Sequence, residues 1–284
     1  MDLLSADEIR RAVQLALAED VGSGDITTLA TIPASAMARA VMIAREPVVV
    51  AGLPVAEAVF RQLSEAVNVV PGAKDGDHAK AGHSLLEVSG AAQAVLTAER
   101  VALNFVQRLS GVATFTSRFV DAIKGTRAKI LDTRKTTPGL RRLEKYAVVC
   151  GGGYNHRIGL FDRVLIKDNH LAALKDATPN AMAAAVARVR ERYPRHKIEV
   201  EADSLEQVEQ ALAVGAEIIL LDNMNLVQLR VAAHQARGRA ETEASGGVNL
   251  ANVRQIAETG VDYISVGAIT HSARAMDIAL DFEL

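Results

Sequence analysis

The residues of this chain that are best suited to chemistry gather in one positively charged segment. From Arg134 to Lys167, eight lysines and arginines stand against two acidic residues, although the 284-residue chain has a formal net charge of −2. Three strings within the segment, TRKTTPG, GGGYNHR and LIKDNH, supply Arg134, Lys135, His156, Arg157 and Lys167. Arginine can bind a carboxylate or phosphate through two parallel hydrogen bonds, and lysine adds a mobile point charge. The segment therefore predicts a site for a small ligand with several negative charges.

A nucleic-acid groove is the weaker interpretation of this segment. Such a groove needs a broad basic face, usually with exposed aromatic side chains. Here the sequence pI is about 6.4, aromatic residues make up 4% of the chain and tryptophan is absent. A compact anionic ligand fits these values better.

Composition indicates an ordinary globular protein with a large core, because 49% of residues are hydrophobic and 23% are charged. The first twenty residues show an apolar period of about 3.6 and predict an amphipathic helix instead of a signal peptide. No run approaches the roughly 18 apolar residues of a membrane span. The single cysteine, Cys150, excludes an intrachain disulfide and predicts a buried small apolar side chain in a cytoplasmic protein.

The elements that must position the charged residues form a regular series in the second half. Short β-rich runs alternate with helical patterns, which is typical of a parallel sheet. The predicted strands are 129–133, 164–168, 198–202, 217–222, 241–245 and 262–267, and the predicted helices include 181–193, 205–214 and 249–259. If the sheet closes into a barrel, its strands end on one rim with the residues Arg134, Lys167, Glu201, Asp222, Ser245 and Gly267. Barrel enzymes keep their chemistry on that rim. An open doubly wound sheet is the alternative, but the chain has neither GxGxxG after its first strand nor a P-loop.

The first 110 or so residues have a different pattern. Runs at 39–46, 48–52, 68–72 and 84–90 predict an antiparallel sheet, and 20–28 predicts a turn that leads into a strand. Residues 92–125 predict long helical segments with a break at Ser110 and Gly111.

The chain resembles the quinolinate phosphoribosyltransferase family through strings that run in order nearly from end to end. They are EDVGSGDITT, AERVALNFVQRLSGVAT, DTRKTTPGLR, KYAVVCGGGYNHRIGLFDRVLIKDNH, EVEADSLEQ, LLDNM, ASGGV and ISVGAITHS. The resemblance implies a pentosyltransferase of de novo NAD biosynthesis, which joins quinolinate to 5-phosphoribosyl-1-diphosphate. The products would be nicotinate mononucleotide, pyrophosphate and CO2.

The same resemblance implies a fold and an assembly. We expect an N-terminal open α/β sandwich at 1–112 and an incomplete α/β barrel at 113–271, with 272–284 packing on the sandwich. The family works as a homodimer or higher oligomer, in which the sandwich of one subunit covers the barrel mouth of another, and it uses Mg2+. No nucleic acid or membrane partner is expected.

The family's site residues carry over to matching positions in this chain. The resemblance implies a cationic cup for the two carboxylates of quinolinate, made of Arg134, His156, Arg157 and Lys167 with Thr133 nearby and Arg100 reaching in from a neighbouring subunit. Lys135 would lie toward the diphosphate, and Glu201 and Asp222 would hold Mg2+ and the ribose or diphosphate; these three are the expected catalytic residues. The 5-phosphate would meet backbone N–H groups of Ser245, Gly246, Gly247, Gly267 and Ala268. Asn223 and His271 are possible supporting residues near that corner.

Several residues also have simpler interpretations. Arg141, Arg142 and Lys145, at helical spacing, predict a solvated face, and His170 suits a helix cap or a core position better than a ligand role. Glu199 alternates with Glu201, so both can point inward, and either can be a buried ion-pair partner; the strand-end position favours Glu201 for the metal. His156 follows three glycines and precedes Arg157, which favours a site role over a structural one.

The expected reaction needs no side-chain nucleophile. Departure of diphosphate leaves an oxocarbenium-like ribose, so positioning and electrostatic stabilisation carry the rate. Whether Lys135 or Lys167 assists decarboxylation is left open by the sequence. Three alternatives also stay open: a paralogous phosphoribosyltransferase fold with another acceptor, a Schiff-base aldolase that uses Lys167, and a non-catalytic anion-binding module.

Overall fold

The computed structural model describes residues 4–283, which form two compact units. One unit comprises the residues up to Ser117, residues 136–152 and the C-terminal part from Ile269; the other comprises residues 118–135 and 153–268. The chain thus passes between the units at more places than the expected boundaries after residues 112 and 271. The extreme ends of the expected sandwich, residues 1–3 and 284, lie outside the described residues. No helix among the described residues is long and apolar enough to cross a membrane.

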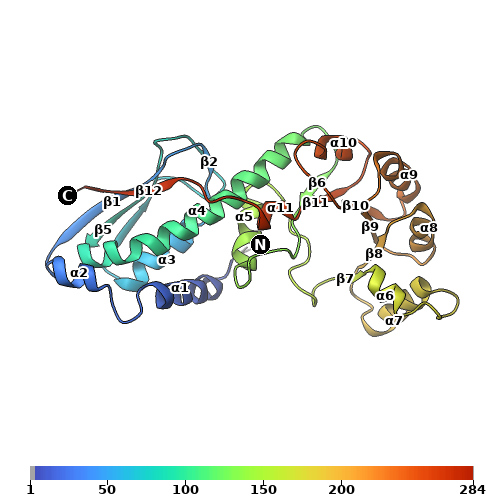
Figure 1. Cartoon of the computed structure of the whole chain (residues 1–284), viewed down its shortest axis with the longest axis horizontal. Coiled ribbons are helices and arrows are strands. Elements are labelled where there is room, and N and C mark those ends of the chain that lie inside the picture. Colours follow the sequence, from blue (N-terminus) through green and yellow to red (C-terminus); the bar gives the residue numbers. More distant parts are fainter. Residues whose placement is uncertain (1–3, 284) are drawn as a thin grey trace. The chain divides into compact units, whose positions relative to one another are not determined.

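The first unit is built on the antiparallel sheet that the sequence predicted. Its strand order is β12-β1-β5-β3, with bounds Ile278–Glu283, Met37–Ala44, Ser84–Ala91 and Asn68–Pro71. Alternate residues of β1, including Ala40 and Met42, are fully buried, as expected for a sheet with one covered face. Figure 1 shows α3 (Leu53–Leu63) and α4 (Ala92–Ala122) over this sheet, while α1 (Ala6–Asp20) packs on α3. The short strands β2 (Val48–Val49) and β4 (His78–Ala79) pair separately.

The turn predicted at 20–28 leads into a short helix that was not predicted, α2 (Ile26–Thr31), and the expected strand, β1, follows this helix. The cause of this helix is Asp25, whose carboxylate accepts the backbone N–H of Thr28 at 3.0 Å and its hydroxyl at 2.5 Å. This is an N-cap, which satisfies the first free donors of a helix.

The predicted helix break at Ser110 and Gly111 was also wrong, because α4 is continuous from Ala92 to Ala122. Ser110 turns its hydroxyl to Ala51, accepting from the backbone N–H at 3.0 Å and donating to the carbonyl at 3.2 Å. A Cβ at Gly111 would lie 1.9 Å from the carbonyl oxygen of Arg274. Both residues therefore serve close packing between backbones instead of ending the helix.

The basic residues of α5 (Arg141–Cys150) do not form the solvated face that the sequence predicted. Lys145 is 1% exposed, and Arg142 bonds to Glu8 with Nε 2.5 Å from the carboxylate. In the same helix the fully buried Glu144 accepts from Arg108 at 2.6 Å and from the hydroxyl of Thr137 at 2.7 Å. Arg142 and Glu144 thus pair with other residues of the first unit.

The second unit contains the predicted parallel sheet. Its order is β6-β11-β10-β9-β8-β7, with bounds Lys129–Leu131, Tyr263–Ser265, Glu241–Ser245, Ile218–Asp222, Ile198–Ala202 and Val164–Ile166. The connecting helices are α6 (Asp168–Ala172), α7 (Ala181–Arg192), α8 (Leu205–Ala213), α9 (Leu226–Ala236) and α10 (Val253–Ala257), followed by α11 (Ala268–His271). Figure 1 shows α8, α9 and α10 on the outer side of the curved sheet. β6 and β7 lie at the two ends of the strand order, and among the described residues they do not pair with each other. The sheet is therefore an incomplete barrel, as expected.

Replacement of Gly111 by alanine tests the close packing of α4. We expect Gly111→Ala to lower the free energy of unfolding by roughly 1–3 kcal/mol, because the added methyl group overpacks a filled space. Helix propensity alone predicts the opposite sign, since alanine is favoured over glycine by about 1 kcal/mol. Urea unfolding followed by circular dichroism measures the difference, with Asn104→Ala at an exposed position of the same helix as control. A Gly111→Ala protein as stable as the wild type would contradict the packing argument.

Candidate active site

A cavity of about 690 Å³ opens at the carboxyl ends of the parallel strands in the second unit. Its walls contain most of the residues that the sequence marked for a site. These are Thr133, Arg134, Lys135, His156, Arg157, Lys167, Glu201, Asp222, Ser245, Gly246 and Gly247. Residues separated by more than a hundred positions therefore share one space, because parallel strands end on the same rim.

Three predicted site residues are not in this lining. Gly267 and Ala268 directly follow β11, where Ala268 begins α11. Arg100 is exposed on α4 in the other compact unit. The expected roles of these three residues stay predictions.

The lining also contains residues that the sequence analysis did not select: Leu165, Leu220, Glu243 and Ser265. Asn223, considered only as a supporting residue, is in the lining too. Glu243 precedes Ser245 by two positions in β10, so strand alternation puts both side chains on one face. The alternation of side chains along β10 thus predicts that Glu243 faces the site, whereas a search of strand ends does not include this residue.

A buried carboxylate holds the glycine-rich loop against β6. Asp132, with no exposed surface, accepts the backbone N–H of His156 at 2.8 Å and the side-chain amide of Asn155 at 2.7 Å. Tyr154 adds a parallel bridge to Leu131 of the same strand. The loop is therefore pinned where Arg134 leaves β6, and the two basic strings meet in one cavity.

One side of the cavity, called the cationic wall, is formed by Arg134, Arg157 and Lys167, and it holds like charges close together. Arg157 is only 8% exposed, and its guanidinium donates to the carbonyl of Arg163 at 3.3 Å. Burial and the neighbouring charge of Arg134 lower the pKa of Arg157. Because a buried cation beside another cation is costly, an anion in this cavity would relieve the repulsion. The wall is thus arranged for a negatively charged ligand.

The opposite wall carries carboxylates at successive strand ends. Glu201 of β8 pairs with Lys167, whose Nζ lies 3.2 Å from its Oε2. Asp222 of β9 accepts from the side-chain amide of Asn223 at 2.7 Å. These two carboxylates face the same cavity and supply the hard oxygen ligands that Mg2+ prefers, one or two per ion with substrate oxygens completing the shell. The donor set therefore fits that cation.

His170 caps a helix near this wall. Its Nδ1 accepts the backbone N–H of Lys167 at 2.9 Å, at the start of α6. This contact favours the cap interpretation over a ligand role. His271 contacts the hydroxyl of Ser272 through Nδ1 at 2.7 Å, is exposed and is not among the residues that line the cavity.

A corner of the cavity is formed by glycine backbone. Gly246 and Gly247 have φ values of +95° and +62°, and a Cβ at Gly246 would lie 2.1 Å from Oδ1 of Asn223. The amides of Asn249 and Asn252 donate to the carbonyl of Gly247 at 3.2 and 3.0 Å. Tightly turned backbone of this kind suits a phosphate group.

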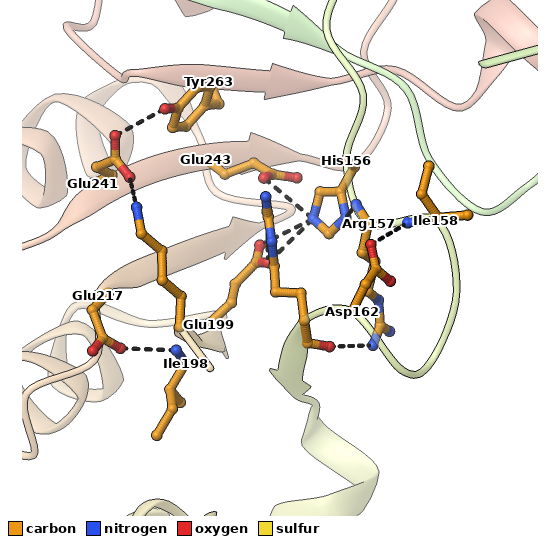
Figure 2. Close-up of polar contacts among 12 residues, drawn as sticks. His156, Arg157, Ile158, Asp162, Ile198, Glu199, Glu217, Glu241, Glu243 and Tyr263 are labelled. Carbon is orange, nitrogen blue, oxygen red and sulfur yellow. Dashed lines mark hydrogen bonds and ion pairs between the residues drawn. The ribbon is translucent and has the colours of Figure 1, made fainter. Parts of the chain in front are cut away.

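A buried acidic group forms the floor below the cationic wall. Figure 2 shows Glu199 and Glu243 pointing toward the ring of His156. The ring Nε2 lies 3.2 Å from Oε2 of Glu199 and 3.4 Å from Oε2 of Glu243. His156 is 7% exposed, Glu199 is 0% exposed and Glu243 is 1% exposed. Of the two alternating glutamates of β8, Glu199 is thus the buried partner and Glu201 lines the cavity.

Comparison with known proteins gives matches along almost the whole chain. Residues 25–110 match the N-terminal domain and residues 112–281 the C-terminal domain of quinolinate phosphoribosyl transferase. A carboxylating nicotinate-nucleotide pyrophosphorylase of Mycobacterium leprae (strain TN) is 48% identical over 281 residues, 97% of each protein. The fold is similar to NadC from Streptococcus pyogenes, with a TM-score of 0.93, 40% identity and 99% of both chains covered. It is also similar to nicotinate-nucleotide pyrophosphorylase from Francisella tularensis, with a TM-score of 0.92, 39% identity and coverage of 99% and 98%.

Proposed function

The chain belongs to the quinolinate phosphoribosyltransferase family. From this membership we propose which part of its cavity binds each substrate. The enzyme transfers the 5-phosphoribosyl group of 5-phosphoribosyl-1-diphosphate to quinolinate. Decarboxylation accompanies the transfer, and the products are nicotinate mononucleotide, pyrophosphate and CO2 for NAD biosynthesis. The observation that supports the division of the site is the sharing of one cavity by a cationic wall, a carboxylate wall and a glycine corner.

Quinolinate occupies the cationic wall in this proposal. Its two adjacent carboxylates pair with Arg134, Arg157 and Lys167, which face one cavity. The dianion would lie between the charges of Arg134 and Arg157, which otherwise repel each other. Lys167 then exchanges its contact with Glu201 for a substrate carboxylate. The ring nitrogen is held by these contacts in the orientation that attack on the ribose requires.

The phosphoribosyl donor occupies the other half of the cavity. Its 5-phosphate lies in the glycine corner at Ser245, Gly246 and Gly247, with Gly267 and Ala268 at the next strand end. Glu201 and Asp222 would hold Mg2+ together with donor oxygens. When bound, the ion supplies positive charge that stabilises the diphosphate leaving group. Lys135, beside Thr133 in the lining, adds a mobile cation on the same side.

The protein's part in the chemistry is positioning and electrostatic stabilisation. Bond breaking at the ribose gives an oxocarbenium-like centre, and the wall residues keep the quinolinate nitrogen in line with it. Once the nitrogen is ribosylated, its positive charge stabilises the carbanion that remains when CO2 leaves the neighbouring carbon. No side-chain nucleophile is needed in either step.

The Schiff-base alternative fits the cavity less well. A Schiff base requires a neutral lysine amine that can attack a carbonyl. The amine of Lys167 instead forms an ion pair with Glu201. This pairing favours anion binding by an ammonium group.

A homodimer or higher oligomer with shared sites is a further part of the proposal. Arg100 is exposed on α4. An exposed arginine in the family's AERVALN string is available to a cavity of a second subunit. Such a contribution would add a cation to the quinolinate wall and cover the bound substrate.

Acceptor choice tests the cationic wall. We expect kcat/KM for nicotinate to be lower than for quinolinate by a factor on the order of 10² or more, because nicotinate lacks one carboxylate and leaves buried cations unpaired at a cost of a few kcal/mol. Arg134→Gln should lower kcat/KM for quinolinate and reduce the ratio of the kcat/KM values for quinolinate and nicotinate. Formation of nicotinate mononucleotide from either acid supplies the assay, and Arg190→Gln, which breaks a surface pair with Glu217, is the control. Comparable turnover of the two acids by the wild type would rule out this wall as the acceptor subsite.

Asp222→Asn tests the carboxylate wall without disturbing the Lys167–Glu201 pair. We expect kcat to fall by a factor on the order of 10², equivalent to roughly 3 kcal/mol at the transition state. Calorimetry should show weaker binding of the donor with Mg2+ and little change for quinolinate. The exposed Asp203, which follows β8, gives the matched control Asp203→Asn. Loss of quinolinate affinity with unchanged donor affinity would contradict the assigned division.

Mixed dimers test the shared site. Arg100→Ala and Lys135→Ala proteins, each inactive alone, should recover about a quarter of wild-type activity after subunit exchange in equal amounts, since half the dimers are mixed and each has one intact site. The matched control combines Arg134→Ala with Lys135→Ala. Both of these residues line the cavity of one chain, so their mixture should recover no activity. No recovery in the Arg100 mixture, despite demonstrated exchange, would place the function of Arg100 within its own subunit.

A further inference from the structure

The buried floor of the cavity contains more ionisable groups than the proposed reaction uses. Glu199 comes from β8, Glu243 from β10 and His156 from the loop that precedes β7. The three side chains converge inside the barrel (Figure 2), and suitable atoms of all three lie within 4.8 Å of one another. Such a group has two physical explanations: a cation site or a hydrogen-bonded support for the histidine.

The hydrogen bonds of the ring decide between them. The backbone N–H of Arg157 donates to Nδ1 of His156 at 2.7 Å, so Nδ1 must carry a lone pair. The ring hydrogen of a neutral imidazole is then on Nε2, the atom that faces both glutamates. A metal ion at this position would need the lone pair of Nε2 and would force a hydrogen onto Nδ1, against the N–H of Arg157. The geometry therefore favours the support.

The two carboxyl groups contact the ring unequally. Glu199 is the hydrogen-bond acceptor, because its Oε1 and Oε2 lie 3.3 and 3.2 Å from Nε2 of His156, and Nη1 of Arg163 lies 3.5 Å from its Oε2. Neither carboxyl oxygen of Glu243 has a hydrogen-bond partner among the described residues. Burial, and then the charge of Glu199, raise the pKa of Glu243 well above its usual value, which favours the neutral acid.

The same contacts fix the backbone of the cationic wall. Asp132 accepts the N–H of His156 at 2.8 Å, and the ring of His156 accepts the next N–H, that of Arg157, at 2.7 Å. The ring is in turn held from below at Nε2. His156 thus connects the inner strands to the residue that carries the guanidinium.

We propose that Glu199 and Glu243 are positioning residues for quinolinate binding, which hold His156 as a neutral Nε2–H ring and through it hold Arg157 at the cavity. Glu199 is the hydrogen-bond acceptor of the ring, and Glu243 lies beside it. Neither touches the reacting atoms. The identity of the ligand in this inference rests on the function proposed above, whereas the state of the ring does not.

Isosteric amide variants test the unequal roles of the two acids. Glu243→Gln resembles a neutral acid, so the KM for quinolinate should rise by no more than about 3-fold. Glu199→Gln removes the acceptor that Arg163 balances, and the KM for quinolinate should rise at least about 10-fold while the KM for the donor stays within about 2-fold. Glu217→Gln is the matched control, because Glu217 lies at the other ends of the strands and pairs with Arg190 and the backbone of Ile198. Equal effects of the two cavity variants, or a Glu199→Gln protein that behaves like the control, would overturn the inference.

The tautomer gives an independent test that needs no glutamate variant. The protein has seven histidines, and 15N labelling of their rings, with His156→Gln to assign one signal, reports which nitrogen of His156 carries hydrogen. We expect the neutral Nε2–H form near pH 7 in the wild type. An Nδ1–H ring or an imidazolium would overturn the inference even if Glu199→Gln failed to fold. A wild type that forms no nicotinate mononucleotide would refute the proposed function instead, and the tautomer result would still stand by itself.

Discussion

The arrangement of the site depends on one buried carboxylate. Asp132, at the end of β6, accepts hydrogen bonds from Asn155 and His156 and so joins two strings that are about twenty residues apart in sequence. Because the group has no exposed surface, these hydrogen bonds satisfy an ion that water cannot reach. Arg134 follows Asp132 by two residues and Arg157 follows His156 by one, so the same contact sets the spacing of the cationic wall.

Charge separation within one cavity is the second organising feature. Arginines gather on the strands and loops around β6, carboxylates at the ends of β8 and β9, and bare backbone at the end of β10. The ion pair of Lys167 and Glu201 joins the cationic and acidic sides of the cavity. A ligand with both an aromatic dianion and a phosphoribosyl diphosphate finds a complementary surface for each part, and binding both parts brings the reacting atoms together.

The floor supports the cationic wall through the ring of His156. Glu199 accepts a hydrogen bond from Nε2 of the ring and pairs with Arg163, and Glu243 lies beside them. Nδ1 of the same ring accepts the backbone N–H of Arg157. The buried strands and the binding wall are therefore linked by hydrogen bonds through one side chain.

The sequence by itself determined the family, the parallel sheet, three strands of the antiparallel sheet and most of the cavity lining, because motifs, strand alternation and strand ends are local properties of a chain. Tertiary structure decided what depends on distant partners. A helix break was expected at Gly111, but this glycine lets helix α4 pack closely against the backbone of Arg274. Lys145 was expected on a solvated face, but its side chain is buried. The short helix α2 was not predicted, although its capping contact at Asp25 is local and was open to prediction. The neutral form of His156 required three groups from separate elements to meet, since a proton's position follows from hydrogen-bond geometry that no single segment contains.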